Sequence, residues 1–165
     1  MPSVPALEVR PVRNGRGLVS LREFAVGDRV AVIRGRVLSV SRVWALWDRD
    51  PQRAANCIRF GPDEYLDPHG ELGAFANHSC RPNSSLHREG RVLVLRALRA
   101  IAAGREVTHD YSTFTGADDV WTMRCNCGER RCRGRVRSVD RLPAAVRSRY
   151  IRAGAIPAFV LATMK

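Results

Sequence analysis

The chain of 165 residues is long enough for one domain with a substantial core. Its hydrophobic fraction of 45% and charged fraction of 27% are typical of a globular protein and exclude a disordered one. No apolar run approaches the roughly 18 residues needed to span a bilayer. The first residues lack the apolar stretch of a secretory signal. We therefore expect a cytoplasmic protein with no membrane contact.

The net charge of +12 comes from 28 basic residues, of which only Lys165 is a lysine. The arginines are scattered from Arg10 to Arg152 and form no single block. One interpretation is a genome whose base composition favours arginine codons. The other is that the arginines gather on one face after folding and make a secondary contact with nucleic acid. The sequence leaves both open.

Strand patterns dominate the chain. The alternating or β-branched segments are residues 7–12, 15–20, 26–40, 85–98 and 105–112. Gly35 interrupts the third segment and indicates a bend or a hairpin there. Gly90 lies in a predicted turn between two strands of the fourth segment.

Helical patterns are weaker. Residues 41–46 favour a single turn, and Pro143 favours a first helical position near the end of the chain. The residues that would share one face of this late helix are Leu142, Val146, Tyr150 and Ile151. Many short strands with little helix predict a mostly β domain with irregular α+β character.

Five cysteines in a chain expected to stay reduced indicate a metal site more than disulfides. Cys57 stands alone in "AANCIRF" and is predicted to be a small buried hydrophobic residue.

The segment "RCNCGERRCRG" holds Cys125, Cys127 and Cys132 in a C-x-C-x4-C cluster. Three thiolates leave a tetrahedral zinc one ligand short. Cys80, in the unusual loop "NHSCRPN", is the favoured fourth ligand. The alternatives are that His78 completes the site, or that the cluster binds no metal.

"NHSCRPN", "EVTHDY" and "CNCGERRCRG", in this order, resemble the signature motifs and the post-SET cysteine cluster of SET-domain protein-lysine methyltransferases. "NGRGL" is similar to the N-terminal glycine motif of that family, so the resemblance runs from about Asn14 to Gly134. The tail "LPAAVRSRYIRAGAIPAFV" is similar to extensions of short, bacterial-type members.

The resemblance implies a SET-type fold of several short β-sheets around a knot-like chain crossing beside the cofactor. A zinc-bound C-terminal post-SET segment and a short terminal helix would complete it. The predicted divisions are a SET domain (residues 8–113), a post-SET zinc-binding segment (114–135) and a C-terminal extension packed on the same domain (136–165).

The resemblance also implies an S-adenosylmethionine-dependent transfer of methyl to a protein lysine held in a narrow channel. Tyr111 matches the catalytic tyrosine of the family and would position amine and methyl. Asn77, His78, Tyr111 and the backbone of Arg16 and Gly17 would line the cofactor pocket. His78 is not proposed as a base. One structural zinc on Cys80 and the cluster would fasten the C-terminal segment as a lid.

His109 lies two residues before Tyr111, so on a strand both side chains point to one face. In the family this position is usually phenylalanine or tyrosine and helps decide how many methyl groups are added. We predict that the polar histidine ring retains a water against the amine, so that monomethylation dominates. The competing interpretation is that the ring bonds a backbone carbonyl instead. Trp121 and Phe114 could wall the lysine channel or pack in the core.

The chain departs from the family pattern at Ala74, where arginine is frequent, and at Gly104-Arg105-Glu106, where "GEE" is usual. Neither departure removes a group that the chemistry needs, but both leave the lysine substrate open. A basic protein repels basic histone-tail-type peptides unless its groove is locally acidic. Two alternative functions remain: a non-catalytic, zinc-stabilised module that binds nucleic acid, and a methyltransferase with an acceptor other than protein lysine.

Overall fold

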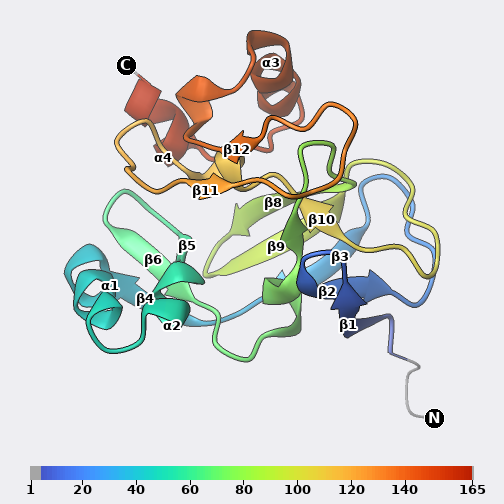
Figure 1. Ribbon diagram of the computed structural model, residues 1–165, viewed down its shortest axis with the longest axis horizontal. Helices are drawn as coiled ribbons and strands as arrows, with labels where there is room; N and C mark the ends of the chain where they lie inside the picture. Colours follow the sequence, from blue (N-terminus) through green and yellow to red (C-terminus); the bar gives the residue numbers. More distant parts are fainter. Residues whose placement is uncertain (1–4, 165) are drawn as a thin grey trace.

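The structure is a computed structural model that describes residues 5–164 (Figure 1). The strands of this part of the chain are β1 (Leu7–Val12), β2 (Gly15–Ser20), β3 (Arg29–Ile33), β4 (Arg36–Ser39), β5 (Ile58–Arg59), β6 (Glu64–Asp67), β7 (Asn77–His78), β8 (Ser84–Glu89), β9 (Val92–Ala97), β10 (Thr108–His109), β11 (Met123–Arg124) and β12 (Arg135–Val136). The α-helices are α1 (Val40–Trp47), α2 (Pro51–Ala55), α3 (Ala144–Arg152) and α4 (Ala158–Leu161).

Within the described residues the strands form several small sheets and no large one. Two sheets have three strands each, in the orders β3-β9-β8 and β4-β6-β5. The remaining pairs are β1-β2, β11-β12 and the parallel pair β7-β10. Helices α1 and α2 gather beside β4 to β6, whereas α3 and α4 lie with β11 and β12 at the C-terminal side (Figure 1). The predicted class, mostly β with irregular α+β character, is therefore confirmed.

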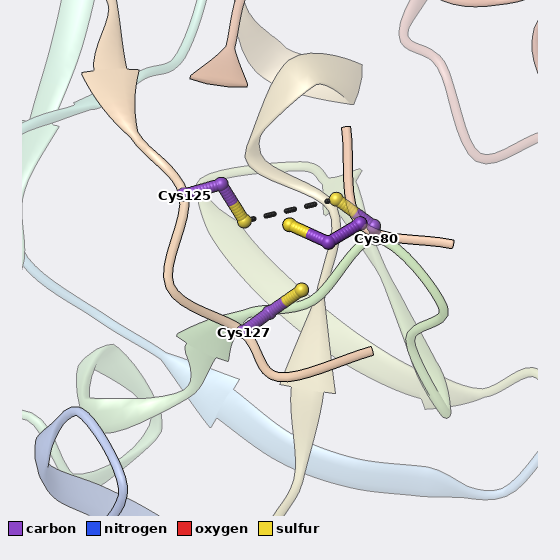
Figure 2. A group of neighbouring side chains, drawn as sticks. Cys80, Cys125 and Cys127 are labelled. Carbon is purple, nitrogen blue, oxygen red and sulfur yellow. Dashed lines mark hydrogen bonds between the residues drawn. The ribbon is translucent and has the colours of Figure 1, made fainter. Parts of the chain in front are cut away.

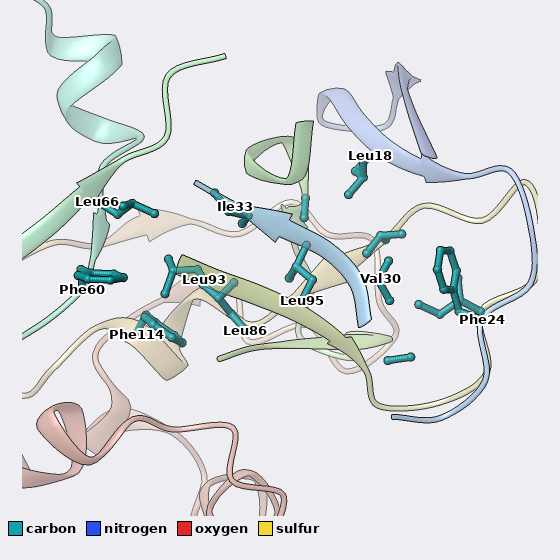
Figure 3. Packing of buried hydrophobic residues seen from close by; sticks show 14 residues of the cluster. Leu18, Phe24, Val30, Ile33, Phe60, Leu66, Leu86, Leu93, Leu95 and Phe114 are labelled. Atoms are coloured by element: carbon teal, nitrogen blue, oxygen red, sulfur yellow. The ribbon is translucent and has the colours of Figure 1, made fainter. Parts of the chain in front are cut away.

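The hydrophobic core follows β3 and β9 through the middle of the molecule (Figure 3). Ile33, Leu93 and Leu95 are almost completely buried there. A second apolar cluster, around Tyr150, joins α3 and α4. Phe159 packs against both clusters, so the C-terminal helices are attached to the strand core.

Several strand predictions are confirmed, including the bounds of β1 and β2 and the hairpin of β8 and β9. Gly90 turns that hairpin with a φ of 60°, a value that favours glycine. Gly35 makes a bend and not a hairpin, because β3 pairs with β9 while β4 pairs with β6. A Cβ at Gly35 would overlap the carbonyl oxygen of Asp67 in the adjacent strand.

The last predicted strand, residues 105–112, was too long. Only Thr108–His109 form a strand, and Tyr111–Phe114 turn into a 3-10 helix capped by the side chain of Asp110. The turn lifts Tyr111 out of the line of the strand.

The predicted helical turn at residues 41–46 belongs to the longer α1. Pro143 is the N-cap of α3 and not its first helical residue. Tyr150 is buried as predicted, but Ile151 is 45% exposed, because it lies about 100° further around the helix. Among residues 5–164, none of the helices combines the length and apolar character that crossing a membrane requires.

Candidate functional site

The two motif loops lie side by side in the parallel pair of β7 and β10, where Asn77 pairs with Thr108. The Asn83 amide continues the pairing beyond the strand. It donates to the carbonyl oxygen of Glu106 at 2.8 Å and accepts from the backbone N–H of Thr108 at 2.9 Å. Pro82 has no backbone N–H to donate. The Asn83 side chain supplies the hydrogen bonds that the backbone of a strand residue would otherwise make.

The His78 ring is fixed between the second motif and the cysteine loop. Its Nδ1 accepts from the backbone N–H of Tyr111 at 3.2 Å, and its Nε2 lies 3.4 Å from the sulfur of Cys80. The proton of the neutral ring is therefore on Nε2, directed at that sulfur. Burial lowers the pKa of His78 to about 4. The side chain orients its neighbours and is poorly suited to act as a base.

A polar cluster surrounds the N-terminal glycine motif. The Asn77 amide donates to the Arg16 carbonyl oxygen at 3.1 Å and to Glu106 Oε1 at 2.9 Å. A Cβ at Gly17 would approach that carboxylate oxygen to 2.6 Å and the Asn77 nitrogen to 3.0 Å, so only glycine fits. A carboxylate beside amide and carbonyl groups suits a ligand with ammonium and sulfonium charges. The sequence analysis did not identify Glu106 as a site residue.

Tyr111 is one of the residues that line a cavity of about 300 Å³. Its hydroxyl donates to the carbonyl oxygen of Ala76 at 3.1 Å, next to Asn77. Burial, and then the negative charge of Glu106, raise the pKa of Tyr111 to about 12. The phenol therefore stays protonated near neutral pH.

The cavity walls are mainly apolar and aromatic. Phe114 and Trp121 both line it, and Phe114 also belongs to the core cluster. The Trp121 and Tyr111 ring centroids are 6.4 Å apart. All three tryptophans of the chain, Trp44, Trp47 and Trp121, line this single cavity.

His109 also lines the cavity, with its ring centroid 4.8 Å from that of Tyr111. Its Nδ1 atom is buried and has no hydrogen-bond partner in the described part of the chain. Among residues 5–164, no backbone carbonyl oxygen accepts a hydrogen bond from Nδ1. The alternative in which the ring bonds a backbone carbonyl is therefore not seen for this atom. Burial lowers the pKa of His109 to about 3, and the ring is neutral at pH 7.

The predicted cysteine cluster is brought together with Cys80 (Figure 2). The sulfur atoms of Cys80, Cys125, Cys127 and Cys132 all lie within 4.8 Å of one another. Those of Cys80 and Cys125 are 3.7 Å apart. Zinc–sulfur bonds of about 2.3 Å in a tetrahedron separate the sulfurs by about 3.8 Å, so these residues fit zinc. His78 is not part of the group, and its ring nitrogens have the partners described above.

Backbone donors surround this cluster. The N–H of Arg133 is directed at the sulfur of Cys80 at 3.4 Å, and that of Gly134 at the sulfur of Cys132 at 3.3 Å. Such contacts stabilise thiolates and orient metal ligands.

Cys57 lies outside the cluster. It is half-buried and lines the cavity, so the prediction of a small buried hydrophobic residue holds only in part.

The cysteine segment is tied to Tyr111 by an ion pair that the sequence analysis missed. Both terminal nitrogens of Arg133 donate to the carboxylate of Asp110 at 2.7 Å, and Tyr150 Oη donates to it at 3.0 Å. Burial alone would raise the pKa of Asp110, but the guanidinium holds it below its usual range. The sequence holds one signal for this pair, because each member is next to a predicted site residue. Arg133 follows Cys132, and Asp110 precedes Tyr111.

Residues 15–112 match the family model described as SET domain. Histone-lysine N-methyltransferase 2B of Homo sapiens is 34% identical over 136 residues, which are 75% of this chain and 5% of that protein. The probable histone-lysine N-methyltransferase set-23 of Caenorhabditis briggsae is 36% identical over 137 residues, 77% of this chain and 53% of that protein. An H3 lysine-4 specific histone-lysine N-methyltransferase of Mycosarcoma maydis is 32% identical over 128 residues, 71% of this chain and 9% of that protein.

This chain therefore corresponds to only part of the length of these relatives, and the similarity of its tail to bacterial-type members stays a prediction. The many small sheets, the paired motifs and the match over residues 15–112 together show that the chain belongs to the SET-domain family.

Proposed function

We propose that the chain is an S-adenosylmethionine-dependent protein-lysine N-methyltransferase. Tyr111 is the catalytic residue, and the cofactor pocket consists of Asn77, His78 and the backbone of Arg16 and Gly17. The observation that supports this best is the location of the Tyr111 hydroxyl. Tyr111 lines an apolar cavity, and its hydroxyl bonds the carbonyl oxygen of Ala76, next to Asn77.

When bound, S-adenosylmethionine supplies an electrophilic methyl group on a sulfonium. The residues of the chain then have to orient the lysine amine and to bind it in its neutral form. The Tyr111 hydroxyl gives its hydrogen to Ala76, so its lone pairs remain available to the amine and to weak contacts with C–H groups. Because its pKa is raised to about 12, Tyr111 acts as a neutral hydroxyl and not as the base.

The cavity itself lowers the cost of a neutral amine. A free lysine has a pKa near 10.4, so removing its proton at pH 7 costs roughly 4 to 5 kcal/mol. An apolar channel disfavours the ammonium form and reduces that cost. His109 is too weak a base to take the proton, because burial lowers its pKa to about 3.

We further propose that one zinc on Cys80, Cys125, Cys127 and Cys132 is structural and that residues 114–135 form the post-SET segment it closes. The SET domain would then be residues 8–113, with residues 136–165 as the extension. Supporting this division, the C-terminal side is attached through the bonds of Asp110 to Arg133 and Tyr150.

The test is methyl transfer by purified, zinc-loaded protein from labelled cofactor to proteins of a cell extract, with modified lysines identified by mass spectrometry. Tyr111→Phe is the matched control. Thermal unfolding with the cofactor, and separately with duplex DNA, distinguishes the enzyme from a nucleic-acid-binding module. Stabilisation by DNA alone, without labelled lysine, would contradict the proposal. Label on another acceptor would assign a different methyltransferase activity.

A further inference from the structure

Helix α1 separates two cavities of different character. One is the aromatic cavity lined by Tyr111 and the three tryptophans. The other, of about 360 Å³, is lined by Arg36, Arg42, Arg49, Arg53 and one carboxylate, Asp67, and its other residues are apolar. We call this second cavity the arginine hollow.

The sequence of α1 explains this division. Val40, Val43, Trp44 and Trp47 recur at helical spacing and line the aromatic cavity. Arg42 and Leu46, four residues apart on α1, line the arginine hollow together with Arg49, which follows the end of the helix. One short helix thus has an aromatic face and a cationic face.

The arginine hollow has an excess of positive charge. Arg53 is neutralised, since its Nε and Nη2 donate to Asp67 Oδ2 at 2.9 and 2.6 Å. Arg36, Arg42 and Arg49 are exposed, and none has an ion-pair partner among residues 5–164. These guanidinium groups are free to bind an anion in solution.

We propose that the arginine hollow binds carboxylates of an acidic segment of the substrate protein, while the target lysine of that segment enters the aromatic cavity. This inference rests on the proposed function and specifies its substrate class. A helix is about 10 Å across, and an extended chain covers that distance in about three residues. Trp44 lines the aromatic cavity and is 60% exposed, so a segment crossing α1 can pack against it.

The aromatic cavity offers little to a basic segment. Its charged lining residues are Arg59 and Asp119. Arg59 is paired with Asp118 through two bonds of 2.6 and 2.9 Å. Asp119 accepts from the backbone N–H of Trp121 at 3.1 Å and has no ion pair among residues 5–164. A basic segment would therefore meet this one carboxylate, whereas an acidic segment would meet the three unpaired arginines of the hollow.

A recessed site also favours a flexible peptide over nucleic acid. A duplex presents its phosphates on a stiff, convex surface, which can touch the rim of a hollow but cannot fill it. Single carboxylate side chains can enter it and form bidentate pairs with guanidinium groups. Arg53 and Asp67 already form an ion pair inside the hollow, in which two guanidinium nitrogens donate to one carboxylate oxygen.

Tryptophan emission provides the assay, because all three tryptophans line the aromatic cavity. The probes are two synthetic peptides with the same central lysine between leucines, one flanked by glutamates and the other by arginines. We expect the acidic peptide to bind about tenfold more tightly at low salt, with a difference that shrinks as salt is added.

The double variant Arg42→Glu/Arg49→Glu should reverse this preference. Glutamate at position 42 can form a capping box with Ser39, the N-cap of α1, so the helix should be retained. The matched control, Arg91→Glu/Arg152→Glu, makes the same charge change at exposed positions elsewhere and should keep the preference for the acidic peptide. Thermal unfolding checks the fold, and Arg49→Gln alone, with a smaller loss expected, replaces the double variant if it unfolds.

Equal binding of the two peptides, or an unchanged preference in the double variant, would overturn the proposal. So would binding of duplex DNA that needs Arg42 and Arg49 in a protein that ignores the acidic peptide. Tryptophan emission measures peptide binding and not methyl transfer. The experiment can therefore contradict the peptide proposal and the proposed function independently. A protein that binds the acidic peptide but methylates no lysine contradicts the activity alone.

Discussion

Replacing His109 by phenylalanine tests how the cavity limits the number of methyl groups. The buried Nδ1 of His109 has no hydrogen-bond partner within residues 5–164, and an unsatisfied polar atom costs about 1 to 3 kcal/mol. A water in the cavity would remove this cost and would lie against the lysine amine. Phenylalanine cannot hold that water, so His109→Phe should shift the product from monomethyl-lysine toward dimethyl-lysine.

The same substitution should stabilise the protein in acid. At pH 7 a water that bonds Nδ1 offsets the cost of burying this nitrogen, so we expect the free energies of unfolding of the variant and the wild type to differ by less than about 1 kcal/mol. The difference should grow in favour of the variant as the pH falls. The folded-state pKa of His109 is about 3, below the unfolded value near 6.5, so the unfolded wild type binds more protons as the pH falls below 6.5. Only the wild type loses stability in this way. The free energy of unfolding of the variant, relative to that of the wild type, should therefore rise by about 1 kcal/mol from pH 7 to pH 5.5.

The assays are urea unfolding of both proteins at pH 7 and pH 5.5, and mass spectrometry of products at equal turnover. Because only the difference between the proteins is used, acid effects on the cysteine cluster cancel. The matched control is His69→Phe, an exposed position in a turn, for which neither readout should change.

Identical ratios of monomethyl to dimethyl product in His109→Phe and wild type would refute the role in product state. A stability difference that does not grow in acid would show that the His109 ring is protonated in the folded protein. The two results are independent, so a structural effect cannot imitate a catalytic one.

Four further predictions concern Tyr111, the pH dependence of the reaction, the zinc site and the Arg133–Asp110 pair. Tyr111→Phe should lower the methylation rate by a factor of about 10 or more and cost about 1 kcal/mol of stability, the value of one hydrogen bond; a much larger loss in urea unfolding would indicate a structural residue. The wild-type rate should rise between pH 7 and 9 as more lysine becomes neutral, and a flat profile would exclude deprotonation as a limit. Metal analysis should give about one zinc per chain, lost in Cys127→Ser, and chelation should weaken cofactor binding while most strands persist; unchanged zinc in Cys80→Ser would exclude that ligand. Arg133→Leu should lower the free energy of unfolding by about 3 to 5 kcal/mol, because Asp110 remains charged and buried, and adding Asp110→Asn should restore part of it; no rescue would contradict this reasoning.

Local patterns carried much of the fold. The bounds of β1 and β2 follow from alternation around a glycine turn, and Gly90 is required by its positive φ. The spacing of Cys125, Cys127 and Cys132 indicated a metal site, and the missing ligand directed attention to Cys80. In each case the signal lies within a few residues of the structure it specifies.

Other features depend on contacts that no local pattern encodes. Strand β5 has two residues and exists because it pairs with β6. Helix α2 is also short, although Asp50 before Pro51 is a recognisable start signal. The charge pair of Arg133 and Asp110 joins residues far apart in sequence, and its partners become evident only when the chain is folded.

The contacts of Tyr111 connect the cysteine segment to the proposed active site. The backbone N–H of Tyr111 is fixed by His78, whose other nitrogen faces the sulfur of Cys80. The residue before it, Asp110, is fixed by Arg133, which follows Cys132. The first connection runs from the proposed ligand Cys80 to the backbone of Tyr111, and the second from the residue after Cys132 to the residue before Tyr111. Loss of the metal should therefore lower the turnover rate at saturating cofactor as well as the cofactor affinity, because Tyr111 itself loses its support.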